Sequence, residues 1–339
     1  MTLQEALNRV IDNHDLTQDE AAEIAGVLMR GEATQAQIGG FLVALRMKGE
    51  TVDEIAGFVR AMRENAIRCP VAVPVVDIVG TGGDHSGTFN ISTTTAFVVA
   101  GAGGAVAKHG NRSISSRSGA ADVLAHLGLS LDLSPEQVAA CVERTGVGFL
   151  FAQSFHPAMK HVGPARREMA VRTVFNLLGP MTNPAGTKRL VIGVFANRWC
   201  RPLAEALGKL GTERAWVVNG SDGLDEITTT GPTHVAEWTG SEVREFEISP
   251  ADADLPVASD SDIKGGEPAE NAGILRSILS GAKGPKRDIV VFNAAAALLV
   301  CGKAGTLKAG AAMAQASIDS GAAQKALDAL VALSKEFRP

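Results

Sequence analysis

From residue 70 onward, short apolar runs of strand length alternate with segments of helical periodicity. Short buried strands that alternate with helices are typical of a mostly parallel sheet, because each helix carries the chain back to the start of the next strand. The sequence therefore predicts an α/β fold. The predicted strands are residues 75–79, 105–107, 147–151, 190–195, 215–219 and 289–292, and residues 228–238 and 242–248 are predicted to form an antiparallel pair.

Residues 1–70 are predicted to form a small all-helical domain in front of an α/β domain of residues 71–339. In each capping box of this region, a threonine side chain can accept a hydrogen bond from the first N–H groups of a helix. An acid or amide three residues later can accept one from the backbone N–H of the threonine. The boxes pair Thr17 with Glu20, Thr34 with Gln37, and Thr51 with Glu54. The helical segment near residues 164–180 is expected to pack with this domain, which would leave a cleft between the two domains for a small ligand.

The composition of the 339 residues favours a soluble enzyme over a protein that binds nucleic acid or spans a membrane. A net charge of −5 and a pI of about 5.8 provide no basic surface for nucleic acid. No apolar run reaches the length that spans a membrane. The four cysteines lie far apart without metal-ligand spacing, which indicates reduced thiols and a cytoplasmic location.

The stretch from residue 75 to residue 119 has the composition of a phosphate site. Glycines in the run Gly80-Thr-Gly-Gly-Asp84 let the backbone approach a ligand closely, and N–H groups at the following helix start can bind an anion. Lys108, Asn111 and Arg112 add a cation and donors about 25 residues later. The glycine spacing matches neither a dinucleotide fingerprint nor a P-loop, so a tight turn without ligand stays an alternative.

Two further groups of residues fit a site for charged ligands. Asp225 and Glu226 follow a predicted strand, where a carboxylate pair could bind Mg²⁺, although a solvated acidic turn is the alternative. Arg166 could recognise a planar carboxylate through two parallel hydrogen bonds, although a surface ion pair is the commoner fate of such a residue. His156 precedes it in the run His156-Pro-Ala-Met-Lys160, and a lone histidine is more often structural.

Together, these motifs resemble those of the anthranilate phosphoribosyltransferase family. The matching strings cover essentially the whole chain: residues 80–84, 90–93, 108–112, 156–160, 172–184 and 222–226. The resemblance implies a large α/β domain with a mostly parallel central sheet flanked by helices, a small N-terminal all-α domain, and a homodimer formed through the N-terminal helices. It also implies transfer of the phosphoribosyl group of 5-phosphoribosyl 1-pyrophosphate to the amine of anthranilate, with two Mg²⁺ ions per subunit.

The resemblance assigns roles at the matching positions. The phosphoribosyl pyrophosphate would be bound by Gly80, Gly83, Asp84, Thr88, Asn90, Ile91, Ser92, Thr93, Lys108, His109, Gly110, Asn111, Arg112, Ser113, Ser116 and Ala120. Anthranilate would be bound by Gly80, His109, Asn111, His156, Arg166 and Pro180. Ser92, Asp225 and Glu226 would serve Mg²⁺, and Lys108, Asp225 and Glu226 would be the catalytic residues. The chain departs from the family pattern at Ala120, where some members carry serine, and at His85, where glycine is frequent.

Two related classes of protein stay open as alternatives. Pyrimidine nucleoside phosphorylases share the fold and a similar glycine loop, but are expected to carry a Lys-x-Ser-Gly-Arg run where this chain has Lys108-His-Gly-Asn-Arg112. Non-enzymatic relatives that bind nucleic acid are expected to carry a basic surface, whereas this chain is net acidic.

Overall fold

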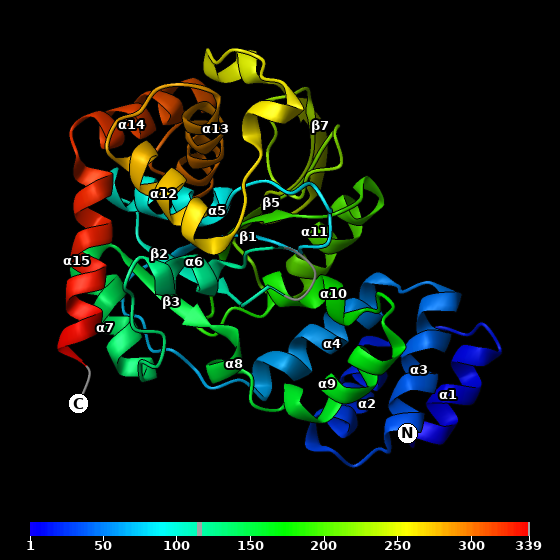
Figure 1. The fold of residues 1–339 in the computed structure, drawn as a ribbon. Coiled ribbons are helices and arrows are strands. Elements are labelled where there is room, and N and C mark those ends of the chain that lie inside the picture. The colour runs from blue at the N-terminus through cyan, green and yellow to red at the C-terminus, as the bar shows by residue number, and fades with distance from the viewer. Residues whose placement is uncertain (114–116, 338–339) are drawn as a thin grey trace.

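The computed structural model describes residues 1–113 and 117–337, which form a helical unit beside a larger α/β unit (Figure 1). The helices are α1 (Leu3–Ile11), α2 (Gln18–Arg30), α3 (Gln35–Lys48), α4 (Val52–Glu64), α5 (Ile91–Gly101), α6 (Ala120–His126), α7 (Pro135–Thr145), α8 (Ala152–Phe155), α9 (Met159–Met169), α10 (Phe175–Leu178), α11 (Cys200–Lys209), α12 (Pro268–Leu279), α13 (Pro285–Val300), α14 (Leu307–Asp319) and α15 (Ala322–Glu336). The four short 3₁₀ turns assigned among the described residues are Gly179–Met181, Asn197–Trp199, Pro250–Ala253 and Asp260–Ile263.

Within the described residues, seven strands form one sheet in the order β3-β2-β1-β4-β5-β6-β7. They are β1 (Val76–Gly80), β2 (Val106–Gly110), β3 (Val147–Phe151), β4 (Arg189–Gly193), β5 (Arg214–Gly220), β6 (Thr233–Trp238) and β7 (Val243–Ile248). The first five strands of that order are parallel, and β6 and β7 continue the sheet antiparallel. The predicted α/β class with a mostly parallel sheet is confirmed.

Helices cover both faces of the sheet, as alternate side chains of the strands require. On one face, Val76 and Ile78 of β1 lie in the same apolar core as α5 and α13, and α14 and α15 pack behind these helices. On the other face, Leu190 and Ile192 of β4 lie in a core with α11. That second core continues through α9 and α10 into α2, α3 and α4, so the helical unit and the α/β unit share buried apolar contacts.

The helical unit consists of α1 to α4, and α9 packs against α2 and α3 (Figure 1). All three predicted capping boxes are present, and Thr2 with Glu5 forms a fourth that the sequence analysis did not predict. The carboxylate of Glu54 is fully buried and also accepts from the Leu16 N–H at 3.0 Å and from Lys48 Nζ at 3.0 Å. One capping residue therefore also fixes the loop before α2 and the end of α3.

Two predicted elements differ from the structure. Residues 289–292, predicted as a strand, lie inside α13, where every residue from Ile289 to Val300 is buried. A helix buried all round lacks the apolar–polar periodicity that distinguishes it from a buried strand. The helix predicted from Pro164 begins earlier, at Met159, and ends at Met169, because Ala170 adopts a left-handed conformation with φ 49°.

Close packing of α4 on α2 leads to a stability prediction. A Cβ at Gly57 would meet the carbonyl oxygen of Gln18 and, at 2.9 Å, the backbone nitrogen of Ala22. We expect Gly57→Ala to lower the free energy of unfolding by about 1–3 kcal/mol, because α2 and α4 must move apart. The measurement is urea or thermal denaturation followed by circular dichroism.

The matched control is Gly273→Ala on the exposed side of α12, where no atom lies within 4 Å of the added Cβ. Alanine has the higher helix propensity, so this change should raise the free energy of unfolding by up to about 1 kcal/mol. Equal effects of the two substitutions would contradict the packing of α4 on α2.

Candidate active site

The predicted phosphate loop lies at the carboxyl edge of the sheet, between the end of β1 and the start of α5. We call residues 81–88 the glycine loop. Gly82 and Gly83 have φ of 72° and 78°, a region that side chains rarely adopt. His85 also has a positive φ, of 58°, which is backbone geometry that glycine adopts more easily than histidine. The start of α5 carries no side-chain cap from Asn90. Its Ile91 N–H donates to the Phe89 carbonyl at 2.8 Å, and among the described residues the Thr93 N–H has no hydrogen-bond partner, so it is open to an anion.

Asp225 and Glu226 turn inward onto this edge rather than into solvent. The Gly82 N–H donates to Asp225 Oδ2 at 2.6 Å, and the Ser92 N–H at the start of α5 donates to Glu226 Oε1 at 3.1 Å. A Cβ at Gly80 would collide with the Asp225 carboxylate, and a Cβ at Gly193 would collide with the Asp225 backbone. The glycines that end β1 and β4 therefore make room for the acidic pair, and a solvated acidic turn is excluded.

A buried lysine lies beside the two acids. Lys108 is 3% exposed, and its Nζ donates to the Ile78 carbonyl at 2.7 Å and to Ser92 Oγ at 3.3 Å. Burial lowers the pKa of Lys108, and the charges of Asp77, Glu226 and Asp225 oppose that shift. Burial also raises the pKa of Glu226 to about 7 and that of Asp225 well above its usual value. Both shifts indicate that the carboxylates lack sufficient positive charge around them.

These carboxylates fit a divalent cation. The neighbouring charge of Asp84 raises the pKa of both Asp225 and Glu226, and Asp84 Oδ2 is buried without a hydrogen-bond partner. No group of three His, Cys, Asp or Glu side chains in residues 1–113 and 117–337 is arranged to hold a metal ion by itself. A cation at this place would therefore need oxygen ligands from a second molecule, which is how Mg²⁺ commonly binds with phosphates.

A second cluster of polar side chains surrounds the buried Asp77, beside the backbone of His109. Asp77 is fully buried and accepts from the His109 N–H at 3.2 Å and from Asn183 Nδ2 at 2.8 Å. Asn183 also donates to the Ala107 carbonyl at 2.7 Å. Burial raises the pKa of Asp77 to about 6, against the charge of Lys108. This group fixes β2 and the segment before β4 in register with the end of β1.

The predicted acceptor residues His109 and His156 lie in contact, with ring centroids 5.1 Å apart. His109 Nδ1 is 3.2 Å from the carbonyl oxygen of Gly179, the residue before the buried Pro180. Burial lowers the pKa of His109 to about 3 and that of His156 to about 4, so both rings are neutral near pH 7. Each Nε2 is buried without a partner among the described residues, which leaves two ring nitrogens available to a ligand.

Arg166 lies on α9, with its guanidinium 5.3 Å from the ring centroid of Phe175. Its side chain forms no ion pair or hydrogen bond with any described residue, and burial lowers its pKa. A half-buried guanidinium without an anion is suited to binding a carboxylate. Among the described residues Arg166 therefore does not form the surface ion pair that was the alternative.

The loop after β2 contains several other residues that are predicted to bind phosphoribosyl pyrophosphate. Asn111 accepts from Gln153 Nε2 at 3.3 Å, and Arg112 pairs with Asp122 at 2.9 Å at the start of α6. Asp122 also accepts from the Ser113 N–H at 3.0 Å. Gly110 lies close to the first residue of α6, Ala120, and Ser116 lies outside the described residues.

The structure limits what three of the predicted residues can offer. The side chains of Ile91 and Thr93 are buried, so only their backbone groups are available at the start of α5. The side chain of Asn90 is already bonded, donating to the Ser118 carbonyl at 3.2 Å and accepting from Asn271 Nδ2 at 3.0 Å. Asn90 therefore connects the start of α5 to the loop before α6 and to α12.

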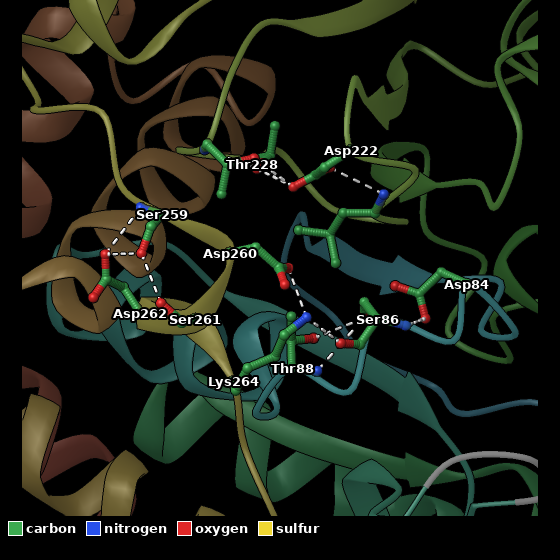
Figure 2. A network of polar contacts seen from close by, with 12 residues as sticks. Asp84, Ser86, Thr88, Asp222, Thr228, Ser259, Asp260, Ser261, Asp262 and Lys264 are labelled. Carbon is green, nitrogen blue, oxygen red and sulfur yellow. Dashed lines mark hydrogen bonds and ion pairs between the residues drawn. The ribbon is translucent and has the colours of Figure 1, made fainter.

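Thr88 lies in a polar network that no sequence pattern indicated (Figure 2). It forms a β-bridge with Lys264, whose Nζ donates to the Ser86 carbonyl at 2.7 Å and pairs with Asp260 at 2.6 Å. The Gly265 N–H donates to the Gly87 carbonyl at 2.9 Å. The segment before α12 therefore fixes the second half of the glycine loop.

Several residues that shape this region had no assigned role in the sequence analysis: Asp77, Asn183, Gly193, Lys264 and Arg172. One signal was available for Asp77, which is an acid within an apolar strand. The others act through contacts between distant segments, which spacing along the chain does not reveal.

Comparison with known proteins places the chain in one family. The helical bundle domain of the glycosyl transferase family matches residues 4–66, and the a/b domain of that family matches residues 72–324. The anthranilate phosphoribosyltransferase of Bradyrhizobium diazoefficiens is 54% identical over 332 residues, which is 98% of each chain.

Solved structures agree with this relationship. The anthranilate phosphoribosyltransferase from Thermus thermophilus matches with a TM-score of 0.93 and 46% identity, over 97% of this chain and 99% of that chain. The Saccharomyces cerevisiae anthranilate phosphoribosyltransferase, in complex with phosphoribosyl pyrophosphate and Mg, matches with a TM-score of 0.91 and 27% identity, over 99% of this chain and 98% of that chain. A structure of the yeast enzyme with 4-fluoroanthranilate matches with a TM-score of 0.89 and 26% identity, over the same shares of the two chains. The chain therefore belongs to the anthranilate phosphoribosyltransferase family.

Proposed function

We propose that this protein transfers the phosphoribosyl group of phosphoribosyl pyrophosphate to the amine of anthranilate and releases pyrophosphate. One observation carries the proposal: the buried Lys108, the acids Asp225 and Glu226, and the start of α5 meet at the glycine loop. Similarity over nearly the whole chain to enzymes named for this reaction supports it. The reaction belongs to tryptophan synthesis.

The donor half of the site would lie between the glycine loop, the start of α5 and the loop after β2. We propose that Ser92, Asp225 and Glu226 serve Mg²⁺, with two ions per subunit. Bound there, Mg²⁺ would supply positive charge to the phosphate oxygens of the donor. The yeast relative that was solved with phosphoribosyl pyrophosphate and Mg supports the choice of magnesium as the metal.

Leaving-group stabilisation would be the main contribution of the donor half to catalysis. Breaking the bond between C1 of the ribose and pyrophosphate concentrates negative charge on the pyrophosphate oxygens. Lys108, the Thr93 N–H of α5 and the Gly83 N–H of the glycine loop are placed before the reaction, so they can stabilise that charge without reorganising. Hydrogen bonds from the Lys108 ammonium to the Ile78 carbonyl and to Ser92 Oγ hold it in place.

The acceptor half would place the anthranilate amine against C1. Arg166 would bind the anthranilate carboxylate, and Asn111 and Pro180 would border the ring. The free Nε2 atoms of His109 and His156 can accept hydrogen bonds from the amine, and neutral imidazoles leave it unprotonated. Positive charge that develops on the ribose makes the weak aromatic amine a sufficient nucleophile. After the bond to C1 has formed and pyrophosphate has left, the amine nitrogen loses its proton to water, so positioning of the two substrates replaces a strong general base.

The test of the proposed function is the loss of anthranilate fluorescence on mixing with phosphoribosyl pyrophosphate and Mg²⁺. Loss that requires the donor supports the transferase, and cleavage of thymidine in the presence of phosphate would instead identify a nucleoside phosphorylase. In this assay we expect Asp225→Asn combined with Glu226→Gln to lower kcat at saturating Mg²⁺ by about 10²–10³-fold, because charge around the leaving group is lost.

The matched control for the carboxylate pair is Glu247→Gln, which removes an exposed carboxylate on β7 and should leave kcat unchanged. Unchanged turnover of the double variant at saturating Mg²⁺ would show that Asp225 and Glu226 do not serve the metal.

Arg166 supplies a separate prediction about the acceptor. Arg166→Ala is expected to raise the KM for anthranilate by about 10- to 100-fold, because a charge-assisted pair with the carboxylate is lost. Arg167→Ala, which removes the next and more exposed guanidinium on α9, should leave that KM unchanged. Steady-state kinetics at saturating donor measures both values, and equal KM values for the two variants would remove Arg166 from the acceptor site.

We further propose a division of the chain at residues 70 and 71 and a homodimer formed through the helical unit. Ile11 at the end of α1 and Met47 near the end of α3 are 63% and 83% exposed, and α1 packs against α3. Large apolar side chains exposed on adjacent helices are typical of an interface between subunits.

The dimer proposal is tested by light scattering coupled to size exclusion. Met47→Glu combined with Ile11→Glu is expected to shift the molar mass from dimer to monomer, because burying two carboxylates is costly. Val257→Glu, at a side chain 71% exposed in the α/β unit, is the control and should leave the dimer intact. A parent protein that elutes as a monomer, or a double variant that stays dimeric, would contradict this interface.

A further inference from the structure

Arg172 contacts the glycine loop from the segment that joins α9 to α10. Its Nη2 donates to the Gly83 carbonyl, and His85 Nε2 lies 3.4 Å from the same atom. The guanidinium also stacks over the ring of Phe195, which follows β4, with its central carbon 4.2 Å from the ring centroid. Among the described residues Arg172 has no carboxylate partner, so its charge faces the loop without compensation.

The loop is held from two sides at consecutive residues. The Gly82 N–H is bonded to Asp225, and the Gly83 carbonyl is bonded to Arg172. The guanidinium lies over Gly83, 3.4 to 3.7 Å from the position of a Cβ. Because Gly82 and Gly83 have positive φ and little intrinsic stiffness, these partners must define how their peptide groups are oriented.

The backbone of Arg172 is itself anchored to the helical unit. Arg46 on α3 donates through Nη1 to the Arg172 carbonyl at 2.7 Å. Arg166 lies just before this segment on α9 and Phe175 begins α10 just after it, and the Arg166 guanidinium lies over the Phe175 ring. The proposed carboxylate-binding arginine and the arginine that contacts the glycine loop therefore lie only six residues apart, on α9 and on the connection that follows it.

We propose that Arg172 is a positioning residue that holds the glycine loop in the geometry required by phosphoribosyl pyrophosphate. This inference rests on the function proposed above. Phe195 fixes the plane of the guanidinium, and the hydrogen bond to Gly83 orients the loop so that its N–H groups face the donor anion. The uncompensated charge of Arg172 adds to the positive potential there. Through Arg46, the position of the loop depends on the helical unit.

The first test is steady-state kinetics of Arg172→Gln. The KM for phosphoribosyl pyrophosphate should rise about tenfold at saturating anthranilate and Mg²⁺, which is the loss of one charge-assisted hydrogen bond. The KM for anthranilate should change by no more than about twofold, since Arg166 remains. Arg172→Lys should recover part of the donor affinity, and Phe195→Leu should raise the donor KM about threefold by removing the ring under the guanidinium.

The second test needs no substrate. Hydrogen–deuterium exchange of the amides in residues 81–88 should be faster in Arg172→Gln than in the parent, because a loop that loses a partner opens more often. Arg167→Gln is the matched control and should change neither the exchange nor the donor KM.

The outcomes separate this inference from the function on which it rests. A parent protein without phosphoribosyl transfer would overturn the proposed function. An active parent with an unchanged donor KM in Arg172→Gln would overturn only the role of Arg172, as would unchanged exchange of the loop. A lower melting temperature with both KM values unchanged would make Arg172 structural and would also overturn the proposal.

Discussion

The close approach of the Asp225-Glu226 turn to the ends of β1 and β4 is the constraint on which the site depends. It is possible only because glycine stands at positions 80 and 193, where a Cβ would collide with the turn. The approach brings both carboxylates within reach of the Gly82 and Ser92 N–H groups and of Lys108. A parallel sheet whose neighbouring strands end together provides this edge, and the antiparallel β6 and β7 let the turn between β5 and β6 return over it.

Burial of so many charges has an energetic consequence. Asp77, Asp225 and Glu226 all have raised pKa values, while that of Lys108 is lowered, because each ion loses more hydration than its neighbours replace. Together with Asp84, these are four acids against one lysine, which leaves the site short of positive charge. A bound cation would relieve that imbalance and would in turn attract a phosphate-rich donor, so binding of the metal and of the donor should be coupled.

Local signals allowed most of the fold to be predicted, and distant contacts account for what was missed. The capping boxes at Thr17, Thr34 and Thr51 depend on residues three apart, and five parallel strands were recognisable as short apolar runs. Residues 289–292 were assigned wrongly because a helix buried on all sides has no polar face to reveal its period. The glycine loop and the acidic pair were recognisable from composition and resemblance. The contacts of Lys264 and Arg172 with the loop join residues 87 or more positions apart, and only the folded chain reveals them.

The apolar core shared by the helical unit and the α/β unit explains how two bound substrates can be held in a fixed relative position. A donor site on the sheet edge and an acceptor site on a separate, freely moving helical unit would seldom align, and misplacement of about 1 Å is enough to slow such a reaction greatly. Here α9 and α10 pack into the same core as α4, β4 and α11. The segment between α9 and α10 touches the glycine loop through Arg172 and the helical unit through Arg46. The relative position of the two halves is therefore set by buried packing and by polar contacts such as those of Arg46 with Arg172 and of Arg63 with Met181, rather than by the linker at residues 65–75 alone.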